Sequence, residues 1–139
     1  MRVAAFLDTN ILVYAATPIG RAPRKAPIGR TLITSGDAGL SAQVLAEFYT
    51  AAQKPAGAGL TGEEAAAWVE RLAVFPCVEI DARLVGHAIS LSQRFRISYW
   101  DAAILAAAER LGAETVYSED LSHGQTYGAV RVVNPFLPA

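Results

Sequence analysis

The chain has 139 residues, a net charge of −1 and an apolar content of 53%. This length is enough to bury a core, and we expect a single domain over residues 1–139. Its one cysteine, Cys77, excludes an internal disulfide and a zinc site made of several thiolates. The balanced charge also excludes a surface that is basic all over, so any contact with nucleic acid must depend on local patches or metal ions.

The sequence shows no sign of a membrane or export segment. No stretch approaches the roughly 20 apolar residues that a membrane span needs, and an acid follows the N-terminus too early for a signal peptide. We therefore expect a cytoplasmic protein. The high apolar content is a weak indication that another chain covers part of the surface.

The first thirty residues predict a strand, a short helix and a loop. Residues 3–7 are all apolar, as in a central parallel strand buried on both faces. Residues 10–16 predict a helix with Asp8 or Thr9 near its cap. Residues 17–30 contain three prolines, two glycines and four basic residues without acidic neighbours, which predict a mobile basic loop.

The rest of the chain alternates between helical and strand patterns. Ser41 predicts the cap of a helix that ends near Lys54, and Thr61 with Glu64 forms a capping box for the next helix, which closes before Pro76. The later elements that we expect are a strand at 77–81, a helix at 82–95, a helix at 99–111 capped by Ser98 and stopped by Gly112, and strands at 114–118 and 129–135, the last at a sheet edge.

Three acidic motifs stand where these elements begin or end. Asp8 follows the first strand, Glu119 and Asp120 follow the strand at 114–118, and Asp101 begins the helix at 99–111. In a parallel α/β sheet, the carboxyl ends of strands and the N-termini of helices share one edge, where such folds bind ligands. We therefore expect these carboxylates to converge.

Asp101 is the most informative of the acids. At 100° per residue it falls within an apolar stripe that includes Trp100 and Ile104, so it faces inward, and we expect Trp100 to be core. The alternative is a capping box with Ser98, because a carboxylate in the first turn also favours the helix dipole. The two roles are compatible.

Each other acid also has an ordinary explanation. Asp8 has the position of a residue that ends a strand and caps a helix. Glu47 lies at the flank of an apolar helix face, so the pattern alone leaves its role open. Glu119 and Asp120 fit a solvated turn in which Ser118 orients a neighbour or a water.

The two histidines have weaker claims. His123 stands in the same turn as the acids but is more typical of a surface residue, and His87 has no motif around it, so we expect it to be structural.

Considered together, the acids indicate a cation. Carboxylates about 4 Å apart repel by about 4 kcal/mol per pair at an effective dielectric of 20. An all-oxygen ligand set without thiolates or paired histidines favours Mg²⁺ or Mn²⁺ over zinc. Magnesium is commonly bound by one or two carboxylates and a substrate phosphate, which points to phosphoryl chemistry.

With these motifs in order, the chain resembles a PIN-domain ribonuclease, and in particular the VapC-like toxins of type II toxin-antitoxin systems. The resemblance covers the whole chain and is carried by FLDTNILVYA, SAQVLAEFY, ISYWDAAILAAAERLG and TVYSEDLSHGQ. It implies an α/β, three-layer PIN-like fold with a central, mostly parallel sheet flanked by helices.

The resemblance also implies an acidic pocket that binds Mg²⁺ or Mn²⁺ and hydrolyses RNA, leaving a 5′-phosphate and a 3′-hydroxyl. The family's four acids carry over to Asp8, Glu47, Asp101 and Asp120, with Glu119 as the alternative for the last. Ser118 stands where a small hydroxyl residue is common, and Asn10 is an auxiliary candidate. The implied partners are RNA, a cognate antitoxin that covers the cleft, and a second copy in a homodimer.

Other readings of the sequence stay open at this point. One is a PIN-like binding module without nuclease activity. Another is an Asp-dependent Mg²⁺ phosphotransferase or phosphatase, although Asn10 rather than an acid follows Asp8 by two, and neither Lys25 nor Lys54 follows a late strand. The basic residues of 17–30, with Arg94 and Arg96, either hold flanking phosphates or form an ordinary solvated surface.

Overall fold

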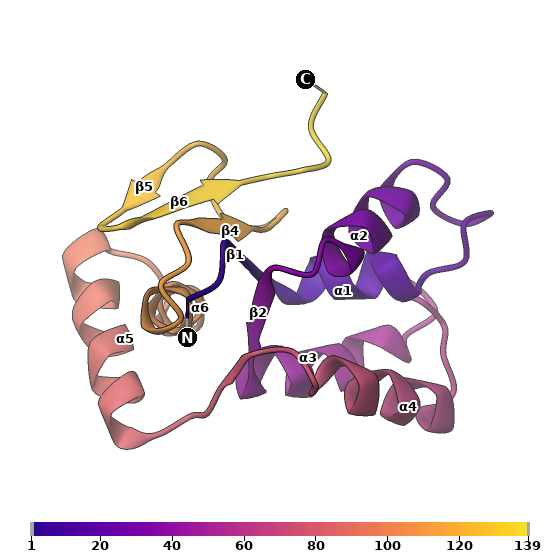
Figure 1. Ribbon diagram of the computed structural model, residues 1–139, viewed down its shortest axis with the longest axis horizontal. Coiled ribbons are helices and arrows are strands. Elements are labelled where there is room, and N and C mark those ends of the chain that lie inside the picture. Colours follow the sequence, from indigo (N-terminus) through magenta and orange to yellow (C-terminus); the bar gives the residue numbers. More distant parts are fainter. Residues whose placement is uncertain (1, 139) are drawn as a thin grey trace.

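The computed structural model describes residues 2–138; the single-domain prediction also includes Met1 and Ala139, which lie outside the described residues. Within residues 2–138, six strands form one sheet in the order β3-β2-β1-β4-β6-β5, as Figure 1 shows. They are β1 (Ala5–Leu7), β2 (Ala38–Ser41), β3 (Cys77–Val78), β4 (Thr115–Tyr117), β5 (Thr126–Tyr127) and β6 (Val130–Val133). The pairs are parallel except β5 with β6, so the predicted mostly parallel sheet is confirmed.

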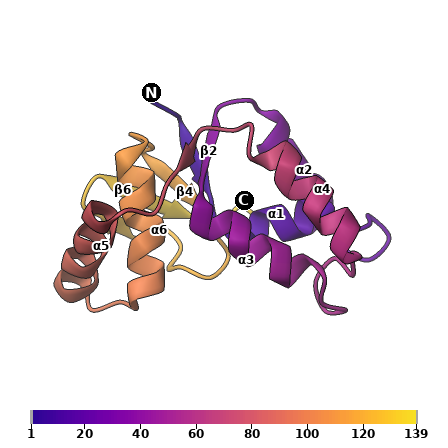
Figure 2. The same ribbon diagram turned by 90° about the horizontal axis from the view of Figure 1, so that it is seen from below.

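Helices cover both faces of this sheet. They are α1 (Thr9–Ala16), α2 (Lys25–Thr34), α3 (Ala42–Ala52), α4 (Gly62–Leu72), α5 (Ala82–Phe95) and α6 (Tyr99–Arg110). Figures 1 and 2 agree that α5 and α6 lie on one side of the sheet and α1 to α4 on the other. The three-layer α/β prediction is therefore confirmed. None of these helices, within residues 2–138, combines the length and apolar character needed to cross a membrane.

Local capping chemistry sets most helix starts as predicted. The Ser41 hydroxyl accepts from the Val44 N–H, and Thr61 and Glu64 form the expected reciprocal capping box. Ser98 caps α6, and Gly112 follows that helix with a φ of 68°, the left-handed conformation that suits glycine at a helix end.

The prediction of a loop throughout residues 17–30 is wrong, because α2 begins at Lys25. Pro27 is the third residue of that helix, where its missing N–H would have had no partner within the helix. Gly29 allows α2 to pack closely on α1, since a Cβ there would lie only 2.9 Å from the Ile11 carbonyl oxygen. The prolines of this segment therefore precede or begin a helix rather than prevent it.

The prediction that Trp100 belongs to the core is also wrong, because it is 64% exposed. In α6 the residues from Ala102 to Ala108 are all buried, so the middle of this helix is surrounded by protein and has no single apolar face. A stripe drawn at helical spacing therefore does not distinguish inside from outside. Trp100 precedes this buried stretch, and its ring packs against that of Tyr99 with the centroids 4.9 Å apart.

The sheet differs from the prediction at its shorter strands. Neither β2 nor β5 was predicted from the sequence, and β3 is shorter than the predicted 77–81. The last strand, β6, is not at an edge, because β5 pairs with its outer side. The sequence AGLS of β2 has little strand propensity, but its Gly39 leaves room for the Leu111 side chain that packs over it.

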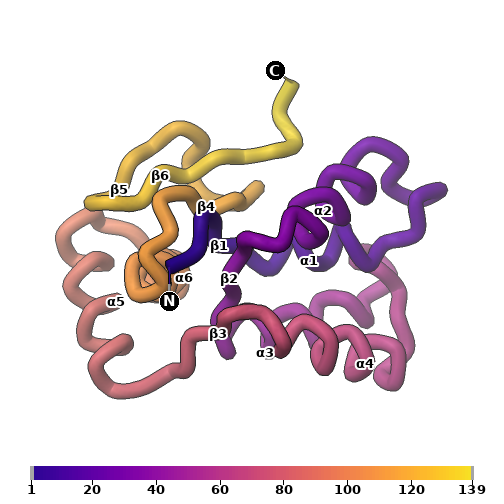
Figure 3. Tube along the Cα trace, in the orientation of Figure 1, coloured from indigo at the N-terminus to yellow at the C-terminus, as the bar shows by residue number. Residues whose placement is uncertain are grey.

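The topology brings distant segments to one edge of the sheet. Figure 3 shows β1 in the middle of the sheet, and the Cα register pairs Leu7 with Tyr117 of β4. Both strands end there in parallel, so Asp8 and Ser118 emerge side by side. The N-terminus of α3 follows β2 directly at the same edge.

Candidate active site

A cavity of about 300 Å³ brings four acids together, namely Asp8, Glu47, Asp101 and Asp120. They come from the end of β1, the middle of α3, the first turn of α6 and the loop after β4. The parallel topology predicts this convergence for Asp8, Asp101 and Asp120, whereas Glu47 joins them from the middle of a helix, which the topology does not predict. The exposed Trp100 lines the same cavity.

Asp8 is the most buried of these acids, with 8% of its surface exposed. Its Oδ1 accepts from the Thr9 N–H at 2.7 Å and its Oδ2 accepts from the Ser118 hydroxyl at 2.7 Å. Burial raises the pKa of the Asp8 carboxyl from 3.8 to about 6; the two hydrogen bonds oppose this rise, and the nearby carboxylates of Asp120 and Glu47 add to it.

Ser118 ties the loop after β4 to Asp8. It is fully buried, and while its hydroxyl donates to Asp8, its oxygen accepts from the N–H groups of Asp120 at 3.1 Å and Leu121 at 3.3 Å. One hydroxyl thereby fixes the direction of the Asp8 carboxylate and the path of the loop that carries Asp120.

The carboxylates of Glu47 and Asp101 are less engaged. Glu47 accepts from the Thr9 hydroxyl at 2.9 Å. In the cap of α6 it is the backbone N–H of Asp101 that donates to Ser98, at 3.1 Å. Among residues 2–138 no hydrogen bond to the Asp101 carboxylate is formed, so the cap does not occupy it. The acid is left facing the cavity.

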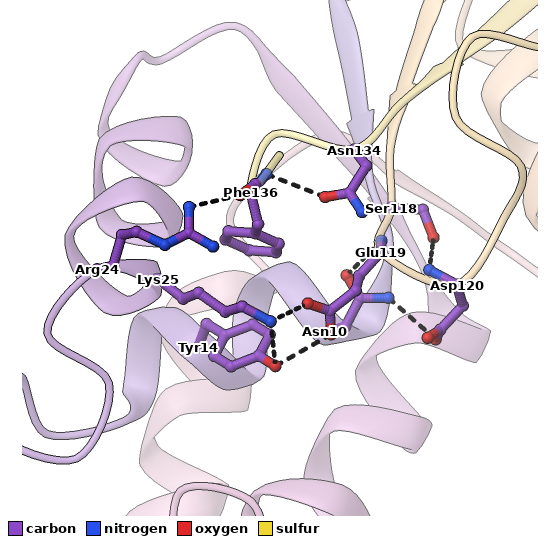
Figure 4. Close-up of polar contacts among 9 residues, drawn as sticks. All are labelled: Asn10, Tyr14, Arg24, Lys25, Ser118, Glu119, Asp120, Asn134 and Phe136. Atoms are coloured by element: carbon purple, nitrogen blue, oxygen red, sulfur yellow. Dashed lines mark hydrogen bonds and ion pairs between the residues drawn. The ribbon is translucent and has the colours of Figure 1, made fainter. Parts of the chain in front are cut away.

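Asn10 holds the neighbouring loop through both ends of its amide. Its Nδ2 donates to Asp120 Oδ2 at 3.1 Å, and its Oδ1 accepts from the Glu119 N–H at 3.1 Å. Figure 4 shows the amide between the two residues. Asn10 thus sets where the Asp120 carboxylate stands relative to α1.

Glu119 points away from the acidic cavity, so the expectation that it converges with the other acids is wrong. Its carboxylate forms an ion pair with Lys25 of α2 and accepts from the Tyr14 hydroxyl at 3.0 Å, as Figure 4 shows. The bond to Glu119 raises the pKa of the Lys25 ammonium above its usual value. Of the two adjacent acids, only Asp120 lines the cavity with Asp8.

The contacts that Lys25, Tyr14 and Thr9 make here were not predicted from the sequence, which offered Lys25 only as a phosphate contact and Thr9 only as a helix cap. Lys25 fell within a predicted loop, and its partner is 94 residues away, so no local pattern connects them. The spacing of Tyr14 four residues after Asn10, one helical turn on, was an available signal.

Both histidines are engaged outside the cavity. His123 Nδ1 accepts from the Asn134 N–H at 3.0 Å, and His87 pairs with Glu109 at 2.9 Å. The structural role expected for His87 agrees with this contact.

The four acids suit a hard divalent cation by their chemistry. They offer only oxygen, they carry the same charge, and one of them is buried. Within residues 2–138 no three acidic, histidine or cysteine side chains stand close enough to hold one ion in common. Mg²⁺ needs only one or two carboxylates when waters and substrate phosphate complete its shell, so this spacing is compatible with it.

A protein-family model described as "PIN domain" matches residues 5–128, which include all four acids. The chain belongs to the PIN-domain family. No curated protein matches it.

Solved structures share this PIN fold over most of their length. A toxin-antitoxin complex from Klebsiella pneumoniae is similar with a TM-score of 0.69 and 19% identity, covering 96% of this chain and 98% of that one. VapC20 of Mycobacterium tuberculosis, a toxin that cleaves the sarcin-ricin loop, gives 0.65 and 18%, covering 84% and 90%. DNA-bound VapBC from Salmonella typhimurium gives 0.66 and 18%, covering 94% and 96%. At these identities the likeness establishes the fold.

Proposed function

We propose that this PIN domain is a Mg²⁺- or Mn²⁺-dependent endoribonuclease and the toxin of a toxin-antitoxin pair. The observation that carries the proposal is the convergence of four carboxylates from separate segments, one of them buried, in one cavity. A protein with the same fold, VapC20, is a toxin that cleaves the sarcin-ricin loop, which supports a nuclease here.

In this proposal Asp8, Glu47, Asp101 and Asp120 form the cation site, with one or two of the carboxylates on the ion directly and the others reaching it through its bound waters. When bound, Mg²⁺ supplies Lewis-acid polarisation of the phosphate and a lowered pKa for the attacking water. Asp8 reaches the cavity from the turn between β1 and α1, and Asp101 reaches it from the first turn of α6. Hydrolysis breaks the bond between phosphorus and the 3′ oxygen and leaves a 5′-phosphate and a 3′-hydroxyl.

Positioning residues act through these acids. Ser118 donates to one oxygen of the Asp8 carboxylate and the Thr9 N–H donates to the other, which fixes the orientation of this carboxylate. Asn10 holds Asp120, and the pair of Lys25 with Glu119 fixes the loop that carries it. Carboxylates that are already fixed lose less conformational entropy when they bind an ion.

We further propose a cytoplasmic location, a homodimer and an antitoxin that covers the cleft. Similar folds occur in toxin-antitoxin complexes, which supports the antitoxin. Several large apolar side chains are exposed on the described chain, as a covered surface requires: Ile19, Tyr49, Val74, Ile80, Ile89, Trp100 and Leu137.

The proposal is tested by incubating the purified chain, free of antitoxin, with total cellular RNA and Mg²⁺, and mapping the new 5′ ends. Discrete cuts bearing 5′-phosphate, abolished by EDTA and by Asp8→Asn or Asp101→Asn, are expected. Glu114→Gln is the matched control, because this acid is exposed and lies outside the cavity. A folded, metal-loaded wild type that cuts nothing would favour a binding module instead.

A further inference from the structure

A second cavity adjoins the acidic one. It has a volume of about 430 Å³ and shares Thr9, Ala51 and Asp120 with its neighbour. Its wall combines the apolar Val13 and the Tyr14 ring with small alanines. A volume of this size falls in the range of small-ligand sites, which is about 300–1,000 Å³.

Two cations line this second cavity, Arg21 and Lys54. They come from segments far apart in the chain, the loop after α1 and the turn after α3. Two acids line it as well: Asp120, where the two cavities meet, and Glu119, whose charge is paired with Lys25. A polyanion that extends from the acidic cavity into this one would therefore meet Arg21 and Lys54 as the cations on its wall.

The other basic residues near Arg21 are already engaged. Arg24 and Arg30 donate to backbone carbonyl groups, and Lys25 is paired with Glu119. Of the four cations in residues 17–30, Arg21 alone lines the cavity. Within residues 17–30, three of the four basic residues therefore make structural contacts, and Arg21 faces the cavity.

Arg21 and Lys54 are suited to an anionic ligand. The Arg21 guanidinium donates to the Pro55 carbonyl, which holds it in place while its remaining N–H groups are available. Both residues are exposed, and within residues 2–138 no acid forms a salt bridge with either. A cation fixed by the protein and not neutralised by it is typical of phosphate recognition.

We propose that this cavity is the subsite for the nucleotide next to the scissile phosphate of a single-stranded RNA, with Arg21 and Lys54 on the phosphate and the Val13 wall against the sugar and base. The inference rests on the proposed function, since it takes RNA as the substrate. The carboxylates of the acidic cavity then act at the reacting phosphate, and Arg21 and Lys54 bind the adjacent phosphate of the RNA.

The test measures binding of a fluorescein-labelled, random-sequence 10-nucleotide RNA by anisotropy, with Mg²⁺, in an Asp101→Asn background that prevents cutting. Arg21→Ala and Lys54→Ala are each expected to weaken binding about three- to ten-fold, and the double variant at least about ten-fold. The slope of log affinity against log salt should fall by about 0.7 for each charge removed.

Two further variants separate this subsite from other effects. Lys54→Glu should weaken binding more than Lys54→Ala, because it places a negative charge in the cavity. Neither variant should unfold the protein, since the exposed Lys54 side chain forms no salt bridge within residues 2–138. Arg131→Ala is the matched control, because Arg131 is exposed on β6 and lines neither cavity, so it should change nothing.

The inference is overturned if the double variant binds within two-fold of its parent, or if Arg131→Ala weakens binding equally. The proposed function fails separately, through a wild type that does not cut RNA. Loss of binding in the double variant together with an inactive wild type would keep Arg21 and Lys54 as phosphate contacts of bound RNA and would reject the nuclease.

Discussion

The buried Asp8 carboxyl makes the stability of the metal-free protein depend on pH. Its pKa is raised in the folded chain from 3.8 to about 6, chiefly by burial. The native state therefore binds this proton more tightly than the unfolded state does. The resulting stability is fully present below about pH 4 and is lost as the pH rises toward and through 6.

The magnitude follows from the two pKa values. At about 1.4 kcal/mol per tenfold, the full difference between 3.8 and about 6 corresponds to roughly 3 kcal/mol. Part of this is already lost at pH 5, so about 1–2 kcal/mol should disappear between pH 5 and pH 8. That is a large fraction of the about 5–15 kcal/mol that stabilises an ordinary domain.

Urea unfolding in EDTA at pH 5, 6 and 8 measures this loss directly. Asp8→Asn should remove that part of the pH dependence, and Mg²⁺ at pH 8 should restore stability to the wild type alone. Asp81→Asn is the control: Arg110 lowers the pKa of Asp81, so its effect belongs to more acidic pH. Equal slopes for wild type and Asp8→Asn between pH 5 and 8 would refute the reasoning.

Three further predictions concern the residues around the acids. Lys25→Met should destabilise the fold by about 1–3 kcal/mol in urea unfolding, because it leaves the half-buried Glu119 without its cation. Glu114→Gln, which breaks an exposed pair, should cost less than about 1 kcal/mol. Equal costs would show that the Lys25–Glu119 pair does not fix its loop. Ser118→Ala should raise the pKa of Asp8 further, because its hydroxyl bond opposes the rise; carbon NMR titration of the carboxyl checks this, and an unchanged midpoint would show that the bond contributes nothing. Trp100→Ala should change the unfolding free energy by less than about 1 kcal/mol, as its exposure implies, and should raise KM for RNA, because the exposed ring lines the acidic cavity and offers a face for base stacking; a large stability loss would show that the ring is packed in solution.

The parts of the fold that the sequence predicts are those set by local chemistry. Ser41, Thr61 and Ser98 cap helices because their hydroxyl groups satisfy N–H groups within three residues. The approach of Asp8 to Asp101 is also predictable, because parallel topology brings strand ends and helix starts to one edge. Their roles as metal ligands stay a prediction.

The features that were missed depend on distant partners. β2 is a strand because β1 and β3 pair with its two sides, not because AGLS favours extension. Lys25 and Glu119 meet across 94 residues, which decides that Glu119 turns away from the acids. The exposure of Trp100 could not be predicted either, because most of α6 is buried on all sides and its sequence has no apolar periodicity that marks an exposed face.

The most direct test of the central claim is a titration with Mn²⁺, monitored through the electron paramagnetic resonance signal of the free ion. Mn²⁺ can stand in for Mg²⁺ because both ions favour oxygen ligands. The wild type should remove Mn²⁺ from solution saturably, Mg²⁺ should compete, and Asp8→Asn and Asp101→Asn should each bind it much more weakly. A wild type that binds no Mn²⁺, or variants that bind it equally well, would contradict a metal centre at these acids.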